Sequence, residues 1–311
     1  MNFSTTLGLS AIAATAMIST TAFAGGEHWT DNFSEAQATA AEGDKDLLLD
    51  FTGSDWCGWC IKLNEEVFSH DEFNEFADSN FVLVELDYPN RKELAEEVVE
   101  QNAELQTRYD VSGFPTIILA DAAGRPYAQT GYQAGGPEAY VAHLQELQQV
   151  RVERDANFAA AEEAEGLEKA QYLHDGLQAM GDTLAVKHYA EVVAEVMELD
   201  ADNEAGLKGH YETLALAAEQ RGLLEAAMSG DVQGDPEGTI AQLDELLTNE
   251  ELTTPIRQEA LAMKSQIMMF VMEDKPGAKV VLEQAIAIAP DSELGQQLAG
   301  ALERFFGDDS E

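Results

Sequence analysis

Two cysteines, Cys57 and Cys60, are the residues whose type and spacing most clearly indicate chemistry in this sequence of 311 residues. They are its only cysteines, and Gly58 and Trp59 separate them. A disulfide between them would close a very small loop, so it would restrict the unfolded chain little and contribute little stability. The pair has three ordinary uses: a redox-active dithiol, half of a metal site, or a local covalent staple.

A zinc site would need two further ligands close to the cysteines. The sequence has no second CxxC motif and no HxxxH pair, and the nearest histidine along the chain is His70. We therefore expect no metal ligands in this chain. A metallochaperone that carries a metal ion on Cys57 and Cys60 remains a weaker alternative.

The residues around the pair predict that Cys57 lies at the start of a helix. Residues 47–51 form a short apolar run, which is typical of a buried strand, and residues 52–55 form a turn. After Cys57 the apolar residues repeat with helical spacing, at Ile61, Leu63, Val67 and Phe68. Free N–H groups and the helix dipole favour a thiolate at a helix N-terminus, so Cys57 is the expected nucleophile. Cys60 would lie one turn further along the helix.

More strands are expected before residue 150. They are residues 81–87, 116–120 and 127–130, followed by a closing helix at 137–150. Residues 88–110 separate the second and third expected strands.

Residues 28–148 resemble the thioredoxin superfamily, in particular its extracytoplasmic branch with a Cys-Gly-Trp-Cys motif. The matching segments are Leu48-Leu49-Asp50-Phe51, Trp56-Cys57-Gly58-Trp59-Cys60, Val111-Ser112-Gly113-Phe114-Pro115-Thr116 and Gly131. The resemblance implies an α/β domain with a mixed central sheet flanked by helices. It also implies that Cys57 attacks a disulfide and that Cys60 resolves the product. The redox-active Cys57–Cys60 disulfide would be the reactive group, with no other cofactor.

The resemblance assigns roles to two catalytic neighbours. Pro115 is expected to follow a cis peptide bond and to present the backbone of Phe114 to an extended substrate segment. The alternative is an ordinary trans proline at the start of a strand. Asp50 resembles the buried acid that assists the resolving cysteine, although one extra residue lies between it and Cys57. The alternative is a carboxylate at the end of a strand that faces solvent.

Two tryptophans flank the nucleophile and are expected to contact substrate. Trp56 matches the family's tryptophan before the first cysteine and is expected to shield the site. Trp59 is either a platform that faces the substrate or a side chain packed partly on the sheet. Three features differ from thioredoxin itself: the extra residue before Cys57, the Gly58-Trp59 dipeptide, and residues 88–110, which we interpret as a long insertion.

The charge near Cys57 bears on the direction of electron flow. Asp55 lies two residues before Cys57, and the intervening dipeptide of the motif has no basic residue. We therefore expect only a modest lowering of the thiol pKa. This favours reduction or isomerisation over strong oxidation.

From residue 151 onward the sequence is rich in Ala, Leu and Glu and shows no strand-like alternation. Helices are expected at 153–164, 166–180, 183–199, 204–228, 236–248, 255–272, 277–289 and 292–306. Similar breaks near 194–203 and 285–292, and a period of about 34 residues between the helices near 169–180 and 203–214, resemble tetratricopeptide repeats. This resemblance implies an all-α domain of stacked helical hairpins with a concave face. The alternative is an irregular helical bundle.

The first 24 residues contain no charged side chain. An apolar stretch at 7–18 precedes Ala22-Phe23-Ala24, which predicts a signal peptide cleaved after Ala24, although no basic residue precedes the stretch. The alternative is an uncleaved anchor. We expect three parts, 1–24, 25–150 and 151–311, and a periplasmic or secreted protein. After cleavage no segment has the 18 or more apolar residues that a membrane span requires.

The chain has 59 acidic and 17 basic residues, a formal net charge of −42. So few bases cannot form a basic face, so we expect no nucleic acid among its partners. The expected partners are protein substrates with disulfides, an unidentified redox partner, and a protein bound by the helical half. The leading hypothesis is an extracytoplasmic thiol–disulfide oxidoreductase. The alternative to an enzyme is a binding scaffold in which the cysteine pair is idle.

Overall fold

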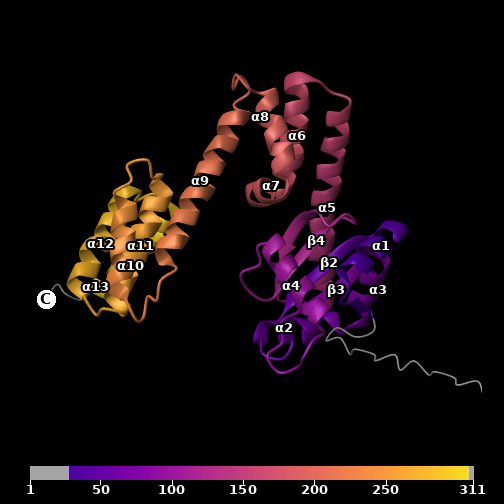
Figure 1. Ribbon diagram of the computed structural model, residues 1–311, viewed down its shortest axis with the longest axis horizontal. Helices are drawn as coiled ribbons and strands as arrows, with labels where there is room; N and C mark the ends of the chain where they lie inside the picture. Colours follow the sequence, from indigo (N-terminus) through magenta and orange to yellow (C-terminus); the bar gives the residue numbers. More distant parts are fainter. Residues whose placement is uncertain (1–27, 308–311) are drawn as a thin grey trace, which may run out of the picture. The chain divides into compact units, whose positions relative to one another are not determined.

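The computed structural model describes residues 28–307, and the chain divides into two compact units (Figure 1). The first unit extends to Glu153 and the second begins at Arg154. The predicted signal peptide, residues 1–24, lies outside the described residues. Between residues 28 and 307, no helix is both long enough and apolar enough to cross a membrane.

A five-stranded mixed sheet, in the order β1-β3-β2-β4-β5, forms the centre of the first unit. Strand β2 (Asp46–Thr52) pairs in parallel with β3 (Phe81–Asp87) and antiparallel with β4 (Thr116–Ala120). Strand β5 (Pro126–Thr130) extends the sheet beside β4, and β1 (Trp29–Thr30) lies beside β3. Strands β2 to β5 confirm the four predicted strands to within one residue. Strand β1 has only two residues, too few for a sequence pattern to predict.

Helices cover both faces of this sheet, so every residue of β2 is buried. Leu47, Leu49 and Phe51 point to one face, where they form a core with α1 (Phe33–Gly43) and α4 (Glu96–Arg108). Side chains alternate along a strand, so Leu48, Asp50 and Thr52 point to the opposite face. Further helices cover that face.

The covering helices begin with α2 (Gly58–Leu63), which continues into the π-helical turn η1 (Asn64–Phe68). They are followed by α3 (Asp71–Asn80) and by α5 (Gly136–Glu162), which begins in the first unit and ends in the second. Aromatic rings join these elements: the ring centroid of Phe68 in η1 is 5.0 Å from Trp29, 4.8 Å from Phe73 and 5.9 Å from Tyr140.

Residues 88–110, which we interpret as an insertion relative to thioredoxin, contain α4 and contribute to the core. Leu105 and Tyr109 are buried in the core between α4 and the sheet. The Asn102 side chain donates a hydrogen bond to the backbone carbonyl at the end of β3, at 2.9 Å. The inward side chains recur every three or four residues, as a helix requires.

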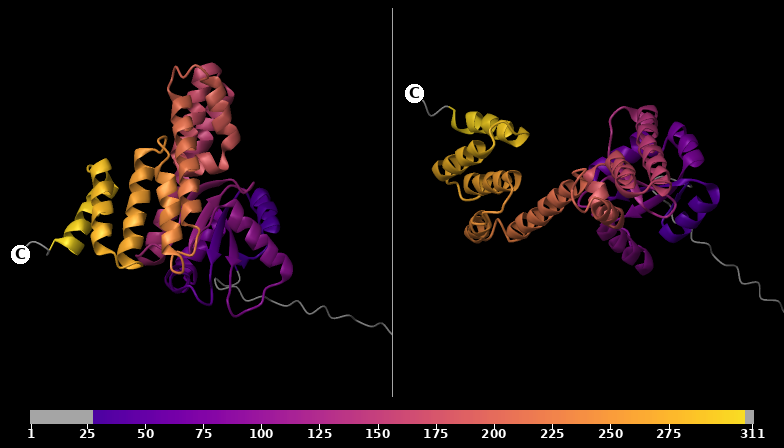
Figure 2. Two further views of the ribbon diagram at one scale, coloured as in Figure 1. Left: turned by 60° about the vertical axis from the view of Figure 1, so that its left-hand side comes forward. Right: turned by 90° about the horizontal axis from the view of Figure 1, so that it is seen from above.

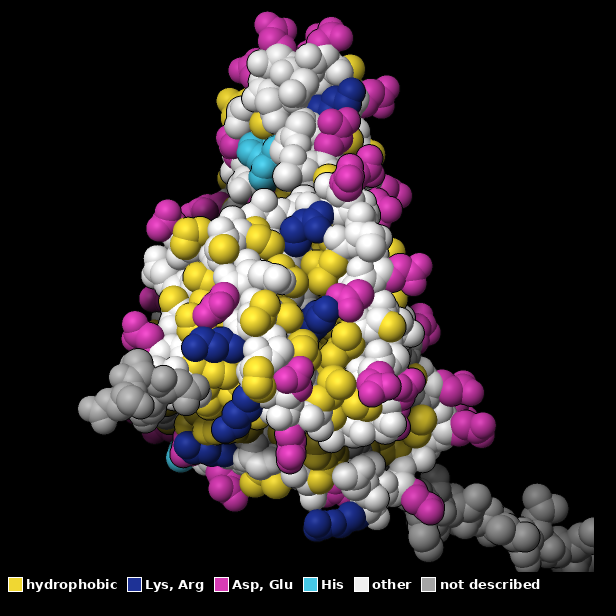
Figure 3. Space-filling view, turned by 90° about the vertical axis from the view of Figure 1, so that its left-hand side faces the viewer, with side chains coloured by type: hydrophobic (Ala, Val, Ile, Leu, Met, Phe, Trp, Pro, Cys, Tyr) yellow, Lys and Arg dark blue, Asp and Glu magenta, His cyan; other side chains and the backbone are white. Residues whose placement is uncertain are grey.

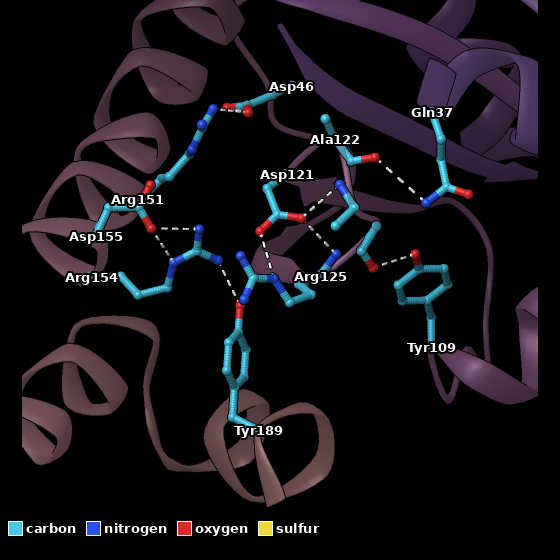
Figure 4. A network of polar contacts seen from close by, with 12 residues as sticks. Gln37, Asp46, Tyr109, Asp121, Ala122, Arg125, Arg151, Arg154, Asp155 and Tyr189 are labelled. Atoms are coloured by element: carbon cyan, nitrogen blue, oxygen red, sulfur yellow. Dashed lines mark hydrogen bonds and ion pairs between the residues drawn. The ribbon is translucent and has the colours of Figure 1, made fainter. Parts of the chain in front are cut away.

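A polar network closes the end of the sheet that lies away from Asp50 (Figure 4). The Asp46 carboxylate binds Arg151 and accepts a hydrogen bond from the Tyr127 hydroxyl at 2.8 Å. Nearby, the Asp121 carboxylate accepts two hydrogen bonds from Arg125. One comes from the Arg125 backbone N–H, at 3.0 Å, and the other from its side-chain Nε, at 2.9 Å. These carboxylates are held by basic side chains and other hydrogen-bond donors, so they stabilise the fold.

The second unit is entirely helical within its described residues. Its helices after α5 are α6 (Gly166–Met180), α7 (Asp182–His188), α8 (Ala190–Leu199), α9 (Leu207–Met228), α10 (Pro236–Leu247), α11 (Thr254–Phe270), α12 (Lys275–Ile288) and α13 (Glu293–Phe306). Two predictions of helix boundaries are wrong. The helix expected at 183–199 is interrupted at Tyr189, between α7 and α8. The helices expected at 137–150 and 153–164 form one helix, α5, because no glycine or proline separates them.

Successive helices of this unit pack on their neighbours in the chain, and α10 to α13 lie side by side in both views of Figure 2. One core joins α11, α12 and α13 through Leu261, Leu282 and Leu298. Polar N-caps define the helix starts: the side chains of Asp235, Asp274 and Ser292 accept hydrogen bonds from backbone N–H groups three residues later. The tetratricopeptide resemblance stays a prediction.

Candidate active site

Cys57 and Cys60 form a disulfide at the start of α2. Cys57 is the N-cap residue, with an extended backbone, and its Sγ accepts a hydrogen bond from the Cys60 N–H at 3.2 Å. Its position at the helix N-terminus confirms the prediction from the sequence. The helix dipole and this N–H would stabilise a thiolate on Cys57 once the disulfide is reduced.

The side chain of Trp56 is held over the loop before α2. Its indole Nε1 donates a hydrogen bond to the backbone carbonyl of Tyr88 at 2.8 Å. Its ring packs against Phe114 in a T-shaped arrangement, with the ring centroids 5.9 Å apart. A Cβ atom at Gly53 would lie 2.6 Å from the Trp56 ring, so only glycine allows this close approach. Trp56 remains 45% exposed, so one side of the ring faces solvent beside the disulfide.

The loop before β4 contacts Trp56 through the Phe114 ring. The peptide bond between Phe114 and Pro115 is cis, which confirms the prediction and excludes the trans alternative. The Phe114 ring also packs against Tyr88, at a centroid distance of 5.0 Å. The contact between Trp56 and Phe114 therefore places the cis-proline loop next to the cysteine pair.

Trp59 belongs to an exposed aromatic surface and does not pack on the sheet. It is 57% exposed, and its ring lies 5.1 Å from the ring of Tyr132. The Lys62 ammonium lies 5.1 Å from the Trp59 ring centroid and 4.8 Å from that of Tyr132. The Tyr132 hydroxyl donates a hydrogen bond to Glu66 at 2.6 Å, which fixes the ring. The alternative of packing on the sheet is therefore wrong, and the role of Trp59 as a platform for substrate stays a prediction.

Sequence reasoning did not identify Tyr132 or Lys62 as parts of this surface. Tyr132 is 73 positions from Trp59 along the chain, and the one signal for it is its place directly after Gly131. A side-chain hydrogen bond with Tyr132 raises the pKa of Lys62, so this base stays charged beside the two rings.

Asp50 lies on β2 behind the disulfide and is only 7% exposed, so the solvent-facing alternative is wrong. Asp50 and Cys60 line the same cavity, of about 90 Å³, beneath α2. Burial raises the pKa of Asp50 well above its ordinary value, and the charges of Glu85 and Asp87 raise it further. The structure therefore brings together the two groups that the resemblance paired, and it adds two more acids from β3.

Asp55, in contrast, is kept in its charged form. Its carboxylate accepts hydrogen bonds from the backbone N–H groups of Asn90 and Arg91, at 2.9 and 2.7 Å. These bonds lower its pKa. A negative charge is thus held two residues before Cys57, which weakens the stabilisation of a thiolate there.

Known proteins resemble the first unit of this chain. Residues 33–148 match the family described as the thioredoxin-like domain. The chain is 36% identical over 121 residues to the disulfide bond reductase DsbH of Chlamydia pneumoniae, an alignment that covers 39% of this chain and 73% of DsbH. It is 31% identical over 103 residues to the thioredoxin-related protein DsbJ of the same organism, covering 33% of this chain and 30% of DsbJ. Among solved structures, a DsbH oxidoreductase is similar, with 32% sequence identity and a TM-score of 0.38, over 46% of this chain and 95% of that one.

Proposed function

Because this chain belongs to the thioredoxin-like family, we propose that it is an extracytoplasmic thiol–disulfide oxidoreductase that reduces or isomerises protein disulfides. The observation that carries the proposal is the Cys57–Cys60 disulfide at a helix N-terminus, beside a cis Phe114–Pro115 bond. The name of the DsbH relative, a disulfide bond reductase, supports the reducing direction.

The reaction takes place in two exchanges at Cys57. In the reduced protein the Cys57 thiolate attacks a client disulfide, forms a mixed disulfide and releases the first client thiolate, which takes up a proton. Cys60 then loses its proton, attacks Cys57 Sγ and forms the Cys57–Cys60 disulfide, while the second client thiolate leaves. Two electrons have passed to the client. A dithiol redox partner must return two electrons before the next cycle.

The surface around the disulfide supports protein clients. The exposed rings of Trp56 and Trp59, with the half-buried ring of Tyr132 beside Trp59, offer apolar contact area near the cysteine pair, and Lys62 adds a positive charge. An extended segment bound along Phe114 at the cis-proline loop would reach this surface. Large aromatic surfaces of this kind are efficient at binding peptide segments.

The helical unit would recruit a protein partner or select clients. A groove of about 520 Å³ on this unit is lined by apolar side chains and two bases, namely Leu247, Leu261, Ala287, Ile288, Arg257 and Lys264, together with Asp244 and Gln284. On the face of α10 to α13 seen in Figure 3, hydrophobic and basic side chains lie among the acidic ones. The predicted signal peptide at residues 1–24 supports action outside the cytoplasm.

Reduction of insulin disulfides tests the proposal. We expect the full chain to accelerate insulin precipitation in the presence of dithiothreitol, and Cys57→Ala to lower the rate to that of dithiothreitol alone. Cys60→Ala should accumulate mixed disulfides that non-reducing electrophoresis detects, because the resolving thiol is missing. A wild-type chain with no activity above background would favour the scaffold alternative, and stoichiometric copper or zinc after purification would favour the metallochaperone.

A further inference from the structure

Tyr88, the first residue after β3, has no part in the reaction described above, yet it contacts several segments that border the cysteine pair. Its backbone N–H donates a hydrogen bond to the carbonyl of Thr52, at the end of β2, at 2.9 Å. Its ring packs against two others, with centroid distances of 6.4 Å to Phe51 and 5.0 Å to Phe114. Tyr88 therefore joins β2 to the cis-proline loop.

Tyr88, Phe114 and Trp56 form a closed chain of contacts, which we call the aromatic clasp. The Phe114 ring packs on Tyr88, and the Trp56 ring packs on Phe114. The chain closes because Trp56 Nε1 donates its hydrogen bond to the backbone carbonyl of Tyr88. The three residues come from three separate segments, namely the loops after β3, before β4 and before α2. Each side chain is thus restrained by the other two residues.

A helix anchors the clasp from below. The Tyr88 hydroxyl donates a hydrogen bond to the backbone carbonyl of Asn102 on α4, at 2.6 Å. Asn102 is only 2% exposed, and its side chain donates in return to the backbone carbonyl of Asp87. Burial raises the pKa of Tyr88, so its hydroxyl keeps the proton that it donates. Two hydrogen bonds therefore hold the start of the loop after β3 against α4.

The loop before Cys57 is held independently of the Tyr88 ring. The Asp87 carboxylate accepts hydrogen bonds from the backbone N–H and the hydroxyl of Ser54, at 2.9 and 2.7 Å. The Asp55 carboxylate is held by backbone N–H groups of the loop after β3. The Tyr88 ring is therefore not needed to place Cys57. Its specific contribution is to restrain the rings of Trp56 and Phe114.

This restraint matters for a client that binds as an extended segment. Ordering a side chain on binding costs affinity, so rings that are fixed beforehand bind a segment more tightly. Trp56 is 45% exposed, and Phe114 precedes the cis bond along which the client segment would lie. A small disulfide only needs to reach the Cys57 sulfur, so it would gain nothing from a fixed wall of rings.

We propose that Tyr88 is a positioning residue that fixes Trp56 and Phe114 as a preformed wall for extended protein segments. Through this wall it makes the protein favour protein disulfides over small ones. The inference rests on the proposed oxidoreductase function. Tyr88 acts through its two neighbours and takes no part in the exchange of sulfur bonds.

The test compares a protein disulfide with a small one. The reduced full chain is mixed with insulin or with bis(2-hydroxyethyl) disulfide, and its remaining thiols are counted by alkylation at successive times. The variants are Tyr88→Ala, which removes the ring but keeps the backbone carbonyl, and Tyr88→Phe, which keeps the ring. The matched control is Tyr172→Ala, at a half-buried tyrosine on α6.

We expect Tyr88→Ala to raise the insulin concentration for half-maximal rate by about fivefold or more, because two side chains must then be ordered on binding. Its maximal rate and its rate with the small disulfide should match the wild type. Tyr88→Phe should recover most of the loss, and Tyr172→Ala should change neither substrate. If Tyr88→Ala slowed both substrates equally, or neither, the inference would be overturned and the proposed function would stand. A wild-type chain that neither disulfide oxidises would overturn the proposed function itself.

If Tyr88→Ala does not fold by circular dichroism, Tyr88→Leu takes its place, since it keeps apolar volume but offers no flat ring to Phe114. A second measurement leaves Tyr88 unchanged. In a Trp59→Phe chain Trp56 is the one exposed tryptophan, because Trp29 is only 4% exposed. Time-resolved fluorescence anisotropy should then show Trp56 turning with the whole molecule. A large fast component would show that its ring is free and would overturn the inference.

Discussion

The two units use buried aspartates in opposite ways, as Asp50 and Asp200 illustrate. Both side chains are almost fully covered, with exposed fractions of 7% and 1%. Asp50 has an oxygen with no hydrogen-bond partner among the described residues, and burial raises its pKa. Asp200 accepts hydrogen bonds from the backbone N–H groups of Ala205, Leu207 and Lys208, and its pKa is lowered.

The difference shows that local backbone donors, and not burial alone, decide what a covered carboxyl group does. A loop that leads into a helix has unpaired N–H groups, and a carboxylate there stays charged and stabilises the fold. In the interior of a sheet the N–H groups already bond to neighbouring strands, so Asp50 is left with a high proton affinity. The first arrangement builds structure and the second suits proton transfer.

The largest expected effect concerns the chemistry at Asp50. Asp50→Asn removes the buried acid that the family resemblance pairs with Cys60. With the aromatic disulfide 5,5′-dithiobis(2-nitrobenzoate), the first coloured thiolate reports attack by Cys57 and the second reports attack by Cys60 on the mixed disulfide, and we expect the second release to slow by about 100-fold at neutral pH. The first release should change little, because the helix N-terminus and not Asp50 activates Cys57. Equal slowing of both phases would show that Asp50 acts on the whole site and would remove the contrast with Asp200.

The same substitution should increase stability. The folded-state pKa of Asp50 is above its unfolded value, so the folded protein binds the extra proton between these two values and the free energy of unfolding falls as pH rises through that window. Asp50→Asn removes this loss, and we expect it to gain about 1–3 kcal/mol over the wild type at alkaline pH. Urea unfolding of the oxidised proteins across a pH series measures the difference, which should vanish in acid.

Asp200→Asn should have the opposite sign. The pKa of Asp200 is lowered on folding, so its stabilisation is present above the ordinary aspartate pKa and is lost as pH falls through the folded value. We expect a lower melting temperature for α9 and its neighbours at neutral pH, with the deficit shrinking in acid. Asp202→Asn, at an exposed position in the same loop, is the matched control and should change little. Both variants should keep wild-type rates with the aromatic disulfide.

The smallest expected effect concerns client contact. Trp59→Ala removes an exposed ring from the surface it shares with Tyr132 and Lys62. We expect KM for insulin to rise about three- to tenfold, as loss of one aromatic contact implies, while the rate with a small disulfide stays the same. Trp59→Phe keeps a ring and should recover most of the loss. An unchanged KM would place client recognition elsewhere, for example on the helical unit.

Much of the first unit could be predicted because the signals are local. The apolar runs of β2 to β5, the N-terminal position of Cys57 on α2 and the cis bond before Pro115 all involve short segments. The helix α4 within residues 88–110 was not predicted, although its buried side chains Asn102, Leu105 and Tyr109 fall at helical intervals. In the second unit, turn residues marked the ends of the helices well, except where α5 continues through residue 150 and where Tyr189 divides α7 from α8.

The sequence by itself indicated the residues that we expect to carry the chemistry: a cysteine pair separated by two residues, the acid seven positions before it and the tryptophans beside it. It also indicated where most helices and strands lie, because those depend on neighbours within a few residues. Only the tertiary structure decided that Asp50, Glu85 and Cys60 line one cavity, and that Tyr132 lies beside Trp59. These pairs are distant in sequence, and strand register and helix packing, which follow from burying the whole core at once, bring them together.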